Sequence, residues 1–318
     1  MTATTPALID KPIDASTGRP TPLCVEAELI HAVVGLGRFG LTHARKLASL
    51  PGFFLRAAVD RSPAVAASAE LAALQLLSHV DELPPDVASA TVATSDEAHA
   101  EVALTLMRRG CHVLVEKPLC LDPRDGALMI RTARRCGVTL STGHIERFNP
   151  VFDDIVLARL RHAAAESVCS HGARPFMRFR RYSTRDATAA ESVLDLMVHD
   201  IDLLAWLCAI PTDAPLRVIA RKVGVRSVSA RVQLGGLVAD LESGYDIASP
   251  QAQLHVDEAG RELMLDLRSA GRRPDSGDDA MALQYQDFRR AIHGQGRRIA
   301  SGADGLAAVT RAVQVLRA

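Results

Sequence analysis

Length, composition and charge limit the classes to which this protein can belong. The chain has 318 residues, 48% of them apolar, so it can bury a substantial core as one or two globular domains. Lys and Arg together number 37, as do Asp and Glu, so there is no net charge to attract nucleic acid or an anionic membrane. We therefore expect neither nucleic acid nor a membrane as a partner.

The cysteines and apolar runs predict the compartment. The six cysteines form no CxxC pair and no zinc-like spacing with histidine, a pattern typical of reduced thiols. No apolar run approaches the roughly 18 to 20 residues of a membrane span, and no basic stretch followed by an apolar one marks the N-terminus. These features predict a cytoplasmic protein.

The first segment differs from the rest of the chain in composition and in hydrophobic periodicity. Residues 1–28 hold prolines among Thr, Ala and Asp, without a period of 2 or 3.6 residues. Such a segment cannot bury enough apolar surface to order itself. We expect a flexible tail over residues 1–28.

Strands and helices alternate from residue 30 to about residue 145. The predicted strands are 30–35, 53–60, 90–94, 112–118 and 138–144. The predicted helices are 40–49, 63–74, 97–110 and 123–136. Repeated strand–helix–strand units form a parallel sheet with right-handed crossovers, so residues 29–146 are predicted to be a domain with a Rossmann-type parallel sheet.

Strands dominate from about residue 174, after a helix expected to begin near Asn149. Segment 227–234 alternates apolar and polar residues strictly, and 237–245 and 260–267 behave similarly, as in an antiparallel sheet with one wet face. Helices are expected to cover the sheet and to end the chain, at 195–204, 278–293 and 302–317. Residues 147–318 are thus predicted to form a substrate-binding and oligomerisation α+β domain with a large, mostly antiparallel open sheet, and the fold class is α/β.

A glycine motif follows the first predicted strand. Gly35, Gly37 and Gly40 form G-x-G-x-x-G, which permits a tight turn, close approach of a pyrophosphate and close helix packing. Alone, the motif also fits a turn without ligand, but Asp60 ends the next strand, where an acid can bind ribose hydroxyls. Asp60 would repel a 2′-phosphate, which favours NAD over NADP, although Arg61 could soften that repulsion.

A lysine ends the predicted strand 112–118, in the sequence Glu116-Lys117-Pro118. Ligands of parallel sheets bind beyond the carboxyl ends of the strands, so Lys117 is expected to point toward the cofactor. The alternative is a solvated lysine at a strand end, where Pro118 only stops the strand.

The predicted helix around residues 192–204 carries a polar stripe. Asp195, His199 and Asp202 are spaced i, i+4 and i+7, which places them on one helical face. A histidine titrates near neutrality and can act as a base, and Asp202 could fix its tautomer. The alternative is a partly exposed helix face, which we expect for Asp200. No third ligand is evident, so we predict no metal site.

The order of these motifs resembles the glucose-fructose oxidoreductase, inositol dehydrogenase and MocA (Gfo/Idh/MocA) family of NAD(P)-dependent oxidoreductases. The similar stretches are 35–40, 93–103, 113–119, 195–204 and 285–306. The resemblance covers nearly all of residues 30–318. It implies an oxidoreductase acting on a CH–OH group, in which Lys117, Asp195 and His199 face the nicotinamide and His199 takes the alcohol proton. A small residue is frequent in the family where Met197 stands, so the pocket shape can differ.

The resemblance also implies the remaining site residues. The cofactor-binding set is Gly35, Gly37, Arg38, Phe39, Gly40, Asp60, Arg61, Thr94, Ser95, His99, Glu116 and Lys117. The substrate-binding set is His144, Arg147, Asn149, Arg180 and Asp195, although Asn149 also fits a helix cap.

Residues 143–150, GHIERFNP, resemble the branch of the family that oxidises the C3 hydroxyl of UDP-N-acetylglucosamine. A diphosphate needs cationic donors, for which Arg147 and the run Arg178, Arg180 and Arg181 are candidates, the run also fitting a solvated strand edge. The alternatives are an inositol or free-sugar dehydrogenase, an NAD-retaining glycosidase or epimerase, and a non-enzymatic NAD sensor. A homo-oligomer, dimer or tetramer, is expected from the half-polar sheet and the resemblance.

Overall fold

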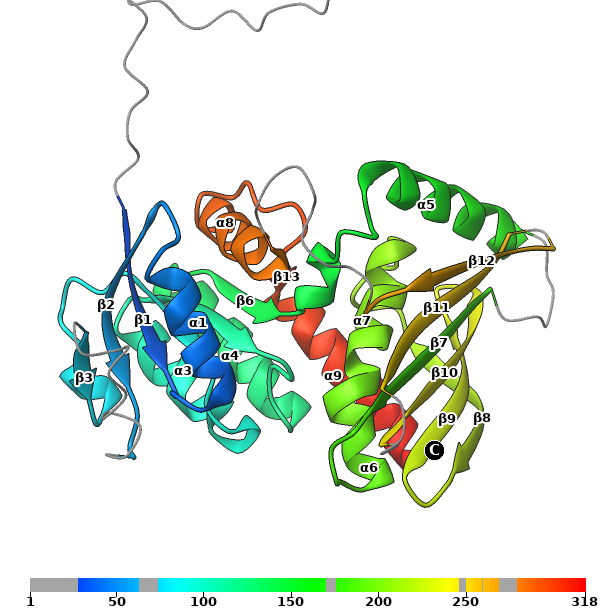
Figure 1. The fold of residues 1–318 in the computed structure, drawn as a ribbon, viewed down its shortest axis with the longest axis horizontal. Coiled ribbons are helices and arrows are strands. Elements are labelled where there is room, and N and C mark those ends of the chain that lie inside the picture. Colours follow the sequence, from blue (N-terminus) through cyan, green and yellow to red (C-terminus); the bar gives the residue numbers. More distant parts are fainter. Residues whose placement is uncertain (1–27, 63–73, 170–175, 246–249, 259, 269–278) are drawn as a thin grey trace, which may run out of the picture.

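The computed structural model describes residues 28–62, 74–169, 176–245, 250–258, 260–268 and 279–318. Two sheets lie in two halves of the molecule, with the last helix running between them (Figure 1). The tail predicted for residues 1–28 and the helix predicted for 63–74 lie almost wholly outside the described residues. The α/β class with a parallel sheet and a mostly antiparallel second sheet is confirmed.

The first sheet, called the parallel sheet below, has the strand order β13-β6-β5-β4-β1-β2-β3. Its strands are β1 (Leu29–Val34), β2 (Phe53–Val59), β3 (Gln75–Leu77), β4 (Ser89–Val92), β5 (His112–Glu116), β6 (Leu140–Gly143) and β13 (Ala300–Ser301). All neighbours pair in parallel except β13, which runs antiparallel to β6. The order reverses between β1 and β4, and this switch point is where such sheets bind ligands.

Helices α1 (Arg38–Leu47), α3 (His99–Arg108) and α4 (Pro123–Cys136) connect these strands. Their ends follow the sequence signals. Asp122 accepts a hydrogen bond from the Arg124 N–H at the start of α4, and Gly137 ends that helix in the left-handed conformation. The 3₁₀ turns η2 (Val80–Glu82), η3 (Asp96–Ala98) and η4 (Ile145–Phe148) complete this half.

The second sheet, called the open sheet, has the order β12-β11-β7-β10-β9-β8. Its strands are β7 (Met177–Ser183), β8 (Leu216–Val223), β9 (Ser227–Leu234), β10 (Leu237–Tyr245), β11 (Gln251–Glu258) and β12 (Arg261–Asp266). Its pairs are antiparallel except β7–β10. In β9, Val228, Ala230, Val232 and Leu234 are buried as the alternation predicts.

Helices cover one face of the open sheet (Figure 1). They are α5 (Asp154–Cys169), α6 (Ala189–Ser192) and α7 (Val198–Leu207). The helix expected to begin near Asn149 begins instead at Asp154, because the Asn149 side chain donates to the Leu267 carbonyl oxygen and accepts from the Val151 N–H. Asn149 therefore follows η4 and ties this turn to the end of the open sheet, and it does not cap α5.

The end of the chain returns to the first half. Helix α8 (Ala280–Ile292) buries Tyr285 and Phe288 in one core with Val33 and Leu47 of the parallel sheet and α1, and β13 extends that sheet. Helix α9 (Gly302–Arg317) packs against α4 and α7. The predicted boundary near residue 146 therefore marks only the point where the chain first passes from the first half to the second. Helix α8 and β13 come later in the sequence but pack in the first half.

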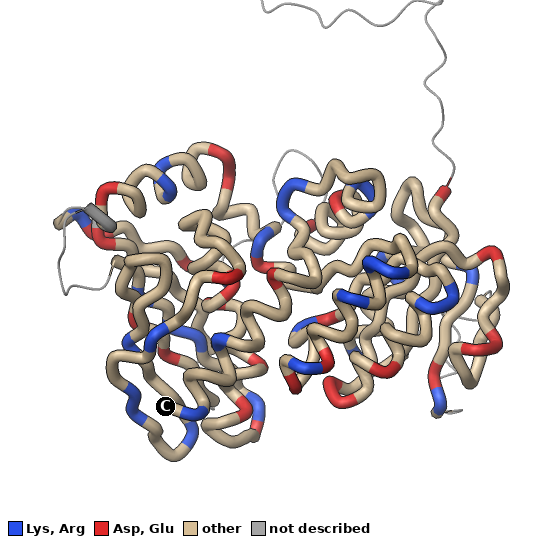
Figure 2. The backbone as a smooth tube through the Cα atoms, turned by 180° about the vertical axis from the view of Figure 1, so that it is seen from behind, with Lys and Arg blue, Asp and Glu red and all other residues tan. Residues whose placement is uncertain are grey.

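Acidic and basic residues are interspersed over both halves of the backbone (Figure 2). Within the described ranges, none of the helices has the length and apolar character that crossing a bilayer requires.

Candidate active site

The glycine turn between β1 and α1 has the geometry that a dinucleotide needs. Gly35 has a φ of +88°, and a Cβ there would lie 2.6 Å from the Ala93 carbonyl oxygen. A Cβ on Gly40 would lie 1.7 Å from the Gly35 carbonyl oxygen, whereas one on Gly37 would meet nothing within 4 Å. The first and third glycines therefore permit the turn and the packing, and the second leaves open space at the start of α1.

A cleft of about 590 Å³ opens at this turn. Eight residues of the predicted cofactor set line it, namely Gly35, Gly37, Arg38, Phe39, Asp60, Arg61, Thr94 and Ser95. The Asp60 carboxylate accepts the Leu36 N–H at 2.6 Å and the Ser62 N–H at 2.8 Å, which fixes it at the cleft wall with acceptor capacity left. The glycine turn, the helix start and Asp60 together fit a dinucleotide.

Other members of the predicted cofactor set lie away from the cleft walls. His99 is buried, and its Nδ1 donates to the Pro118 carbonyl oxygen at 2.8 Å, so it supports the turn after Lys117. Gly40 is packed beneath the turn. Glu116 and Lys117 lie at the end of β5, beyond the walls of this cleft.

Lys117 and Asp195 come together from the two halves of the molecule. The Lys117 ammonium donates to Asp195 Oδ1 at 2.6 Å and to the Asp195 carbonyl oxygen at 3.0 Å. The Lys117 side chain is 15% exposed, so the pair borders solvent but is largely screened from it. Residues distant in sequence thus place a cation and a carboxylate at the carboxyl edge of the parallel sheet.

The polar stripe is not one regular helical face. Val193–Met197 form a π-helical turn, η5, before α7, and its wider spacing changes the direction of Asp195 relative to His199 and Asp202. Tyr245 donates to Asp195 Oδ2 at 2.9 Å. Burial alone would raise the pKa of Asp195, but Lys117, Tyr245 and Arg185 together hold it below its ordinary value. Asp195 is therefore a carboxylate at neutral pH.

His199 is held as a neutral imidazole. Its burial, together with the charges of Lys117, Arg181 and His144, lowers its pKa well below the ordinary value. Its Nδ1 has no hydrogen-bond partner among the described residues, and its ring lies edge-on to that of His144 at a centroid distance of 6.1 Å. A neutral, unpartnered imidazole can accept a proton from a bound hydroxyl.

Asp202 does not orient His199, so that expectation is wrong. Its carboxylate accepts two hydrogen bonds from the fork of Arg147, at 2.8 Å from Nε and 2.6 Å from a terminal nitrogen. His144 Nδ1 lies 3.8 Å from Asp202, and His144 has no hydrogen bond among the described residues. Arg147, 4% exposed, is likewise engaged within the protein and is not the open diphosphate ligand that we predicted.

Asp200 is also buried, contrary to the prediction that it meets water. Arg181 donates to it at 2.9 Å from Nε and to Glu146 at 2.7 Å. The charge of Arg181 makes burial of Asp200 possible, since an unpaired buried carboxylate is very costly. The sequence did not show this pair because its partners are 19 residues apart in the chain.

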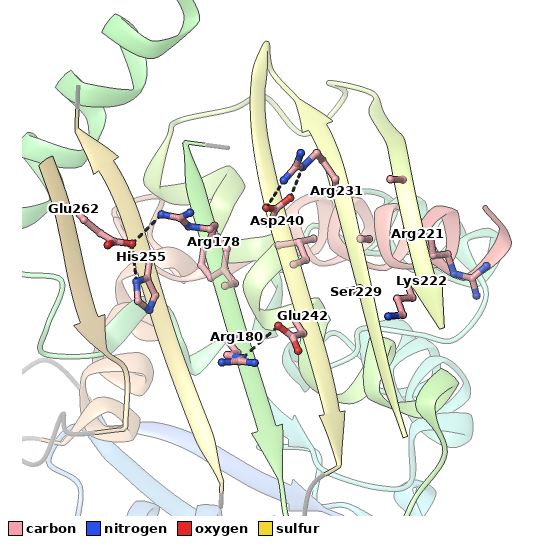
Figure 3. Close-up of a pocket in the computed structure, with 14 residues that line it drawn as sticks. Arg178, Arg180, Arg221, Lys222, Ser229, Arg231, Asp240, Glu242, His255 and Glu262 are labelled. Atoms are coloured by element: carbon pink, nitrogen blue, oxygen red, sulfur yellow. Dashed lines mark hydrogen bonds and ion pairs between the residues drawn. The ribbon is translucent and has the colours of Figure 1, made fainter. Parts of the chain in front are cut away.

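Arg180 lies on the wrong face of the open sheet for the predicted substrate role. Figure 3 shows Arg178 and Arg180 on the face that carries Asp240, Glu242 and Glu262. Arg181, the next residue of β7, points to the opposite face and reaches Asp200 of α7. Arg180 pairs with Glu242 at 3.3 Å, away from the helix that carries Asp195.

A buried hydrogen-bonded chain beneath Lys117 was not predicted. Glu116 accepts from His43 Nε2 at 3.0 Å and from the Lys117 N–H at 3.2 Å. His43 Nδ1 lies 2.8 Å from the Tyr285 hydroxyl, which lies 2.8 Å from the Thr91 hydroxyl. Burial raises the pKa of Glu116, but His43 and Lys117 lower it below its ordinary value. The sequence signal that could have indicated this chain is His43, a histidine on the apolar face of the helix after the glycine motif.

Comparison with known proteins defines the class. Residues 30–144 match the family described as "Oxidoreductase family, NAD-binding Rossmann fold" (GFO_IDH_MocA). The cleft, the glycine turn and this match identify an NAD-binding Rossmann domain. Residues 30–144 are therefore a Gfo/Idh/MocA family domain, and the protein is an oxidoreductase.

Two of the relatives are named for a sugar nucleotide and for a polyol. UDP-N-acetylglucosamine 3-dehydrogenase of Acidithiobacillus ferrooxidans is 27% identical over 89% of this chain and 95% of that protein. Myo-inositol dehydrogenase Hyg17 of Streptomyces leeuwenhoekii is 36% identical over 55% of this chain and 54% of that one. The solved structure of the Acidithiobacillus UDP-N-acetylglucosamine 3-dehydrogenase matches with a TM-score of 0.71 and 25% identity, covering 91% of this chain and 96% of that one. The solved structure of GenD2 from gentamicin A biosynthesis, in complex with NAD, matches with a TM-score of 0.75 at 20% identity. The match covers 92% of this chain and 94% of GenD2.

Proposed function

We propose that the protein is an NAD-dependent dehydrogenase that oxidises the C3 hydroxyl of UDP-N-acetylglucosamine. The observation that supports this reaction is the contact of Lys117 with Asp195 at 2.6 Å, beside a neutral His199, at the carboxyl edge of the parallel sheet. The similarity to a UDP-N-acetylglucosamine 3-dehydrogenase over most of both chains supports the substrate.

The roles of the residues follow from their charges. When bound, NAD supplies the acceptor for the hydride of the substrate carbon. The Lys117 ammonium stabilises the negative charge that develops on the substrate oxygen as the hydroxyl proton leaves. The neutral His199 accepts that proton, and Asp195, fixed by Lys117 and Tyr245, can accept a hydrogen bond from a neighbouring hydroxyl.

NAD is preferred to NADP in this proposal because of Asp60. Its carboxylate lines the cleft and is fixed by the Leu36 N–H, so a phosphate on the ribose would meet a negative charge. Arg61 lines the same cleft and partly offsets that repulsion.

An inositol or free-sugar dehydrogenase is the second candidate, favoured by a specific observation. Arg147 and Arg181 are paired with the buried Asp202 and Asp200. Arg178 and Arg180 lie on the other face of the open sheet, so none of the four predicted diphosphate ligands faces the site. Arg185, 3.4 Å from Asp195 and largely exposed, is the remaining arginine beside the catalytic pair among the described residues. The similarity to a myo-inositol dehydrogenase supports this reading.

The experiment is an activity screen of the full chain with NAD and with NADP. UDP-N-acetylglucosamine, UDP-glucose, myo-inositol and glucose are compared by the absorbance of the reduced cofactor, with Lys117→Ala as the inactive control. The proposal expects NADH from UDP-N-acetylglucosamine at the highest kcat/KM. Turnover of inositol alone contradicts the substrate, product without net NADH indicates a cofactor-retaining glycosidase or epimerase, and NAD binding without turnover indicates a sensor.

We further propose a homo-oligomer, a dimer or tetramer, formed through the uncovered face of the open sheet. That face has a hollow of about 620 Å³ lined by ion pairs such as Arg231 with Asp240 (Figure 3). Met264 of β12 is 59% exposed. Such an apolar and paired-charge surface suits a second copy of the same face. Light scattering after size exclusion tests this, and a monomer for the unmodified chain contradicts it.

A cytoplasmic location is part of the proposal. The described cysteines Cys111, Cys120, Cys136 and Cys208 are free thiols, which suits a reducing compartment. Fractionation of cells that express the tagged chain would test the location.

A further inference from the structure

A second cavity, which we name the arginine pocket, lies behind the Arg147–Asp202 ion pair. It has a volume of about 300 Å³, and its walls include Arg147, Arg161, Arg297 and Arg311. Neither His144 nor His199 lines it. Elements η4, α5, α7 and α9 contribute to it, together with the segment before β13, so the cavity is distinct from the NAD cleft and the catalytic pair.

Arg311 is a buried cation without a carboxylate partner. It is 4% exposed, and one of its terminal nitrogens lies 2.8 Å from the Pro211 carbonyl oxygen, with those of Thr212 and Ala214 also in reach. No carboxylate of the described residues forms an ion pair with it. Burial lowers the pKa of Arg311, opposed by the charges of Asp202, Asp304 and Asp213, which lie beyond ion-pair distance from it. A buried charge that lacks a counter-ion is costly, so this site favours an anion.

Two further arginines at the rim of the arginine pocket are available to bind an anion. Arg161 and Arg297 are exposed, and neither side chain has an ion pair within the described part of the chain. The carboxylates of the pocket are already engaged. Asp202 holds Arg147, and Asp304 accepts from the Ser301 N–H at 2.8 Å and lies 3.5 Å from Arg147. Three guanidinium groups therefore border the cavity without a matching negative charge.

We propose that the arginine pocket binds the phosphate group of a small anionic metabolite. Guanidinium groups bind phosphate oxygens by paired, charge-assisted hydrogen bonds, and the cavity has room for a phosphate with a small organic part. Trp206 supplies an aromatic wall for that organic part. This inference does not depend on the proposed substrate.

The arginine pocket borders the active site through one shared residue. Asp202 lines the cavity and also lies 3.8 Å from His144, whose ring contacts that of His199. An anion in the pocket attracts Arg147 away from Asp202 and changes the electrostatic potential at the two histidines. Occupancy of the pocket thus acts as a regulator of the dehydrogenase site.

The test uses the fluorescence of Trp206, which is the single tryptophan of the chain and lines the pocket. The full chain is titrated at constant ionic strength with inorganic phosphate, with glucose 6-phosphate and with UDP, and sodium chloride serves as the reference. The proposal expects a saturable change in fluorescence with at least one phosphate compound. The compound that binds most tightly distinguishes free phosphate, a phosphate monoester and a nucleotide diphosphate as the source.

Matched variants assign the binding to the pocket. In the double variant Arg161→Gln, Arg297→Gln the dissociation constant should rise at least about tenfold, because two charge-assisted contacts are lost. Arg131→Gln removes an exposed arginine of α4 outside the pocket and should leave the titration unchanged. A change that does not saturate, that chloride reproduces, or that is equal in the double variant and in Arg131→Gln overturns the proposal.

Discussion

The two halves of the molecule build their parts of the site by different means. In the parallel sheet the cofactor cleft depends on backbone geometry, with a glycine at a φ of +88° and an aspartate fixed by a backbone N–H. Beside the open sheet, helix α7 is held by buried ion pairs, Arg147 with Asp202 and Arg181 with Asp200. Local sequence motifs specify the first kind of structure, whereas the second kind requires partners from distant parts of the chain.

This difference predicts where each half is vulnerable. Loss of one member of a buried ion pair leaves an uncompensated charge, while loss of a ligand at an open cleft leaves a group that water can solvate. Substitutions in the buried ion pairs beside the open sheet should therefore lower the free energy of unfolding. Substitutions in the cleft should instead change the affinity for the cofactor.

The largest effect is expected where the halves meet. Lys117→Ala and His199→Ala should each lower kcat by about 10²- to 10⁴-fold, and the double variant by less than the product, because both residues act on the same proton transfer. Steady-state kinetics with NAD and the best substrate of the screen measure this. NADH binding should persist in all three variants. Full kcat in either single variant would show that the catalytic residues are misassigned.

Asp200→Ala tests the buried charges of the second half. It leaves Arg181 without one of its two carboxylates and should lower the free energy of unfolding by about 3 to 5 kcal/mol. The matched control is Asp186→Ala, which breaks a pair with Arg226 in which the carboxylate is 94% exposed, and it should cost less than about 1 kcal/mol. Urea unfolding measures both, and equal losses would contradict the contrast between the halves.

Asp60→Ala tests the cleft. The ratio of kcat/KM for NADP to that for NAD should rise about tenfold or more, which corresponds to roughly 1.4 kcal/mol of relative binding. The exposed Asp86, outside the cleft walls, provides the control variant Asp86→Ala. An unchanged ratio would remove the argument for NAD.

The last effect concerns pH. Burial lowers the pKa of His31 in the parallel sheet to about 3, from 6.5. Below pH 6.5 the unfolded chain therefore binds a proton that the folded chain does not. As the pH is lowered from 6.5 toward 3, the free energy of unfolding falls by about 1.4 kcal/mol per pH unit. His31→Gln should show a shallower loss of unfolding free energy from pH 6.5 to 5. The exposed His162→Gln should keep the slope of the unmodified chain.

The sequence predicted the elements that have local signals. Helices 123–136 and 302–317 and strands 227–234 and 237–245 have the predicted bounds, because caps and strict alternation mark their ends. Strand β3 was missed because it has only three residues and gains its stability from β2. The alternation rule also predicted that one face of β9 is buried.

The site was predictable to the extent that its residues stand in motifs. Lys117 and Asp195 meet as the resemblance implied, across 78 positions of sequence. The roles of Arg147, Asp200 and Asp202 could not be predicted, since each depends on which charge lies opposite after folding. The π-helical turn at Val193–Met197 was also invisible to a helical period of 3.6.

The return of the chain to its first half sets an order on biosynthesis. Tyr285 and Phe288 fill the core beneath β1 and α1, so the ribosome must deliver almost the whole polypeptide before that core can close. Until then, the nascent N-terminal sheet exposes apolar surface to solvent and to chaperones. A premature stop before α8 should yield an aggregation-prone fragment, although such a fragment would keep the entire glycine motif.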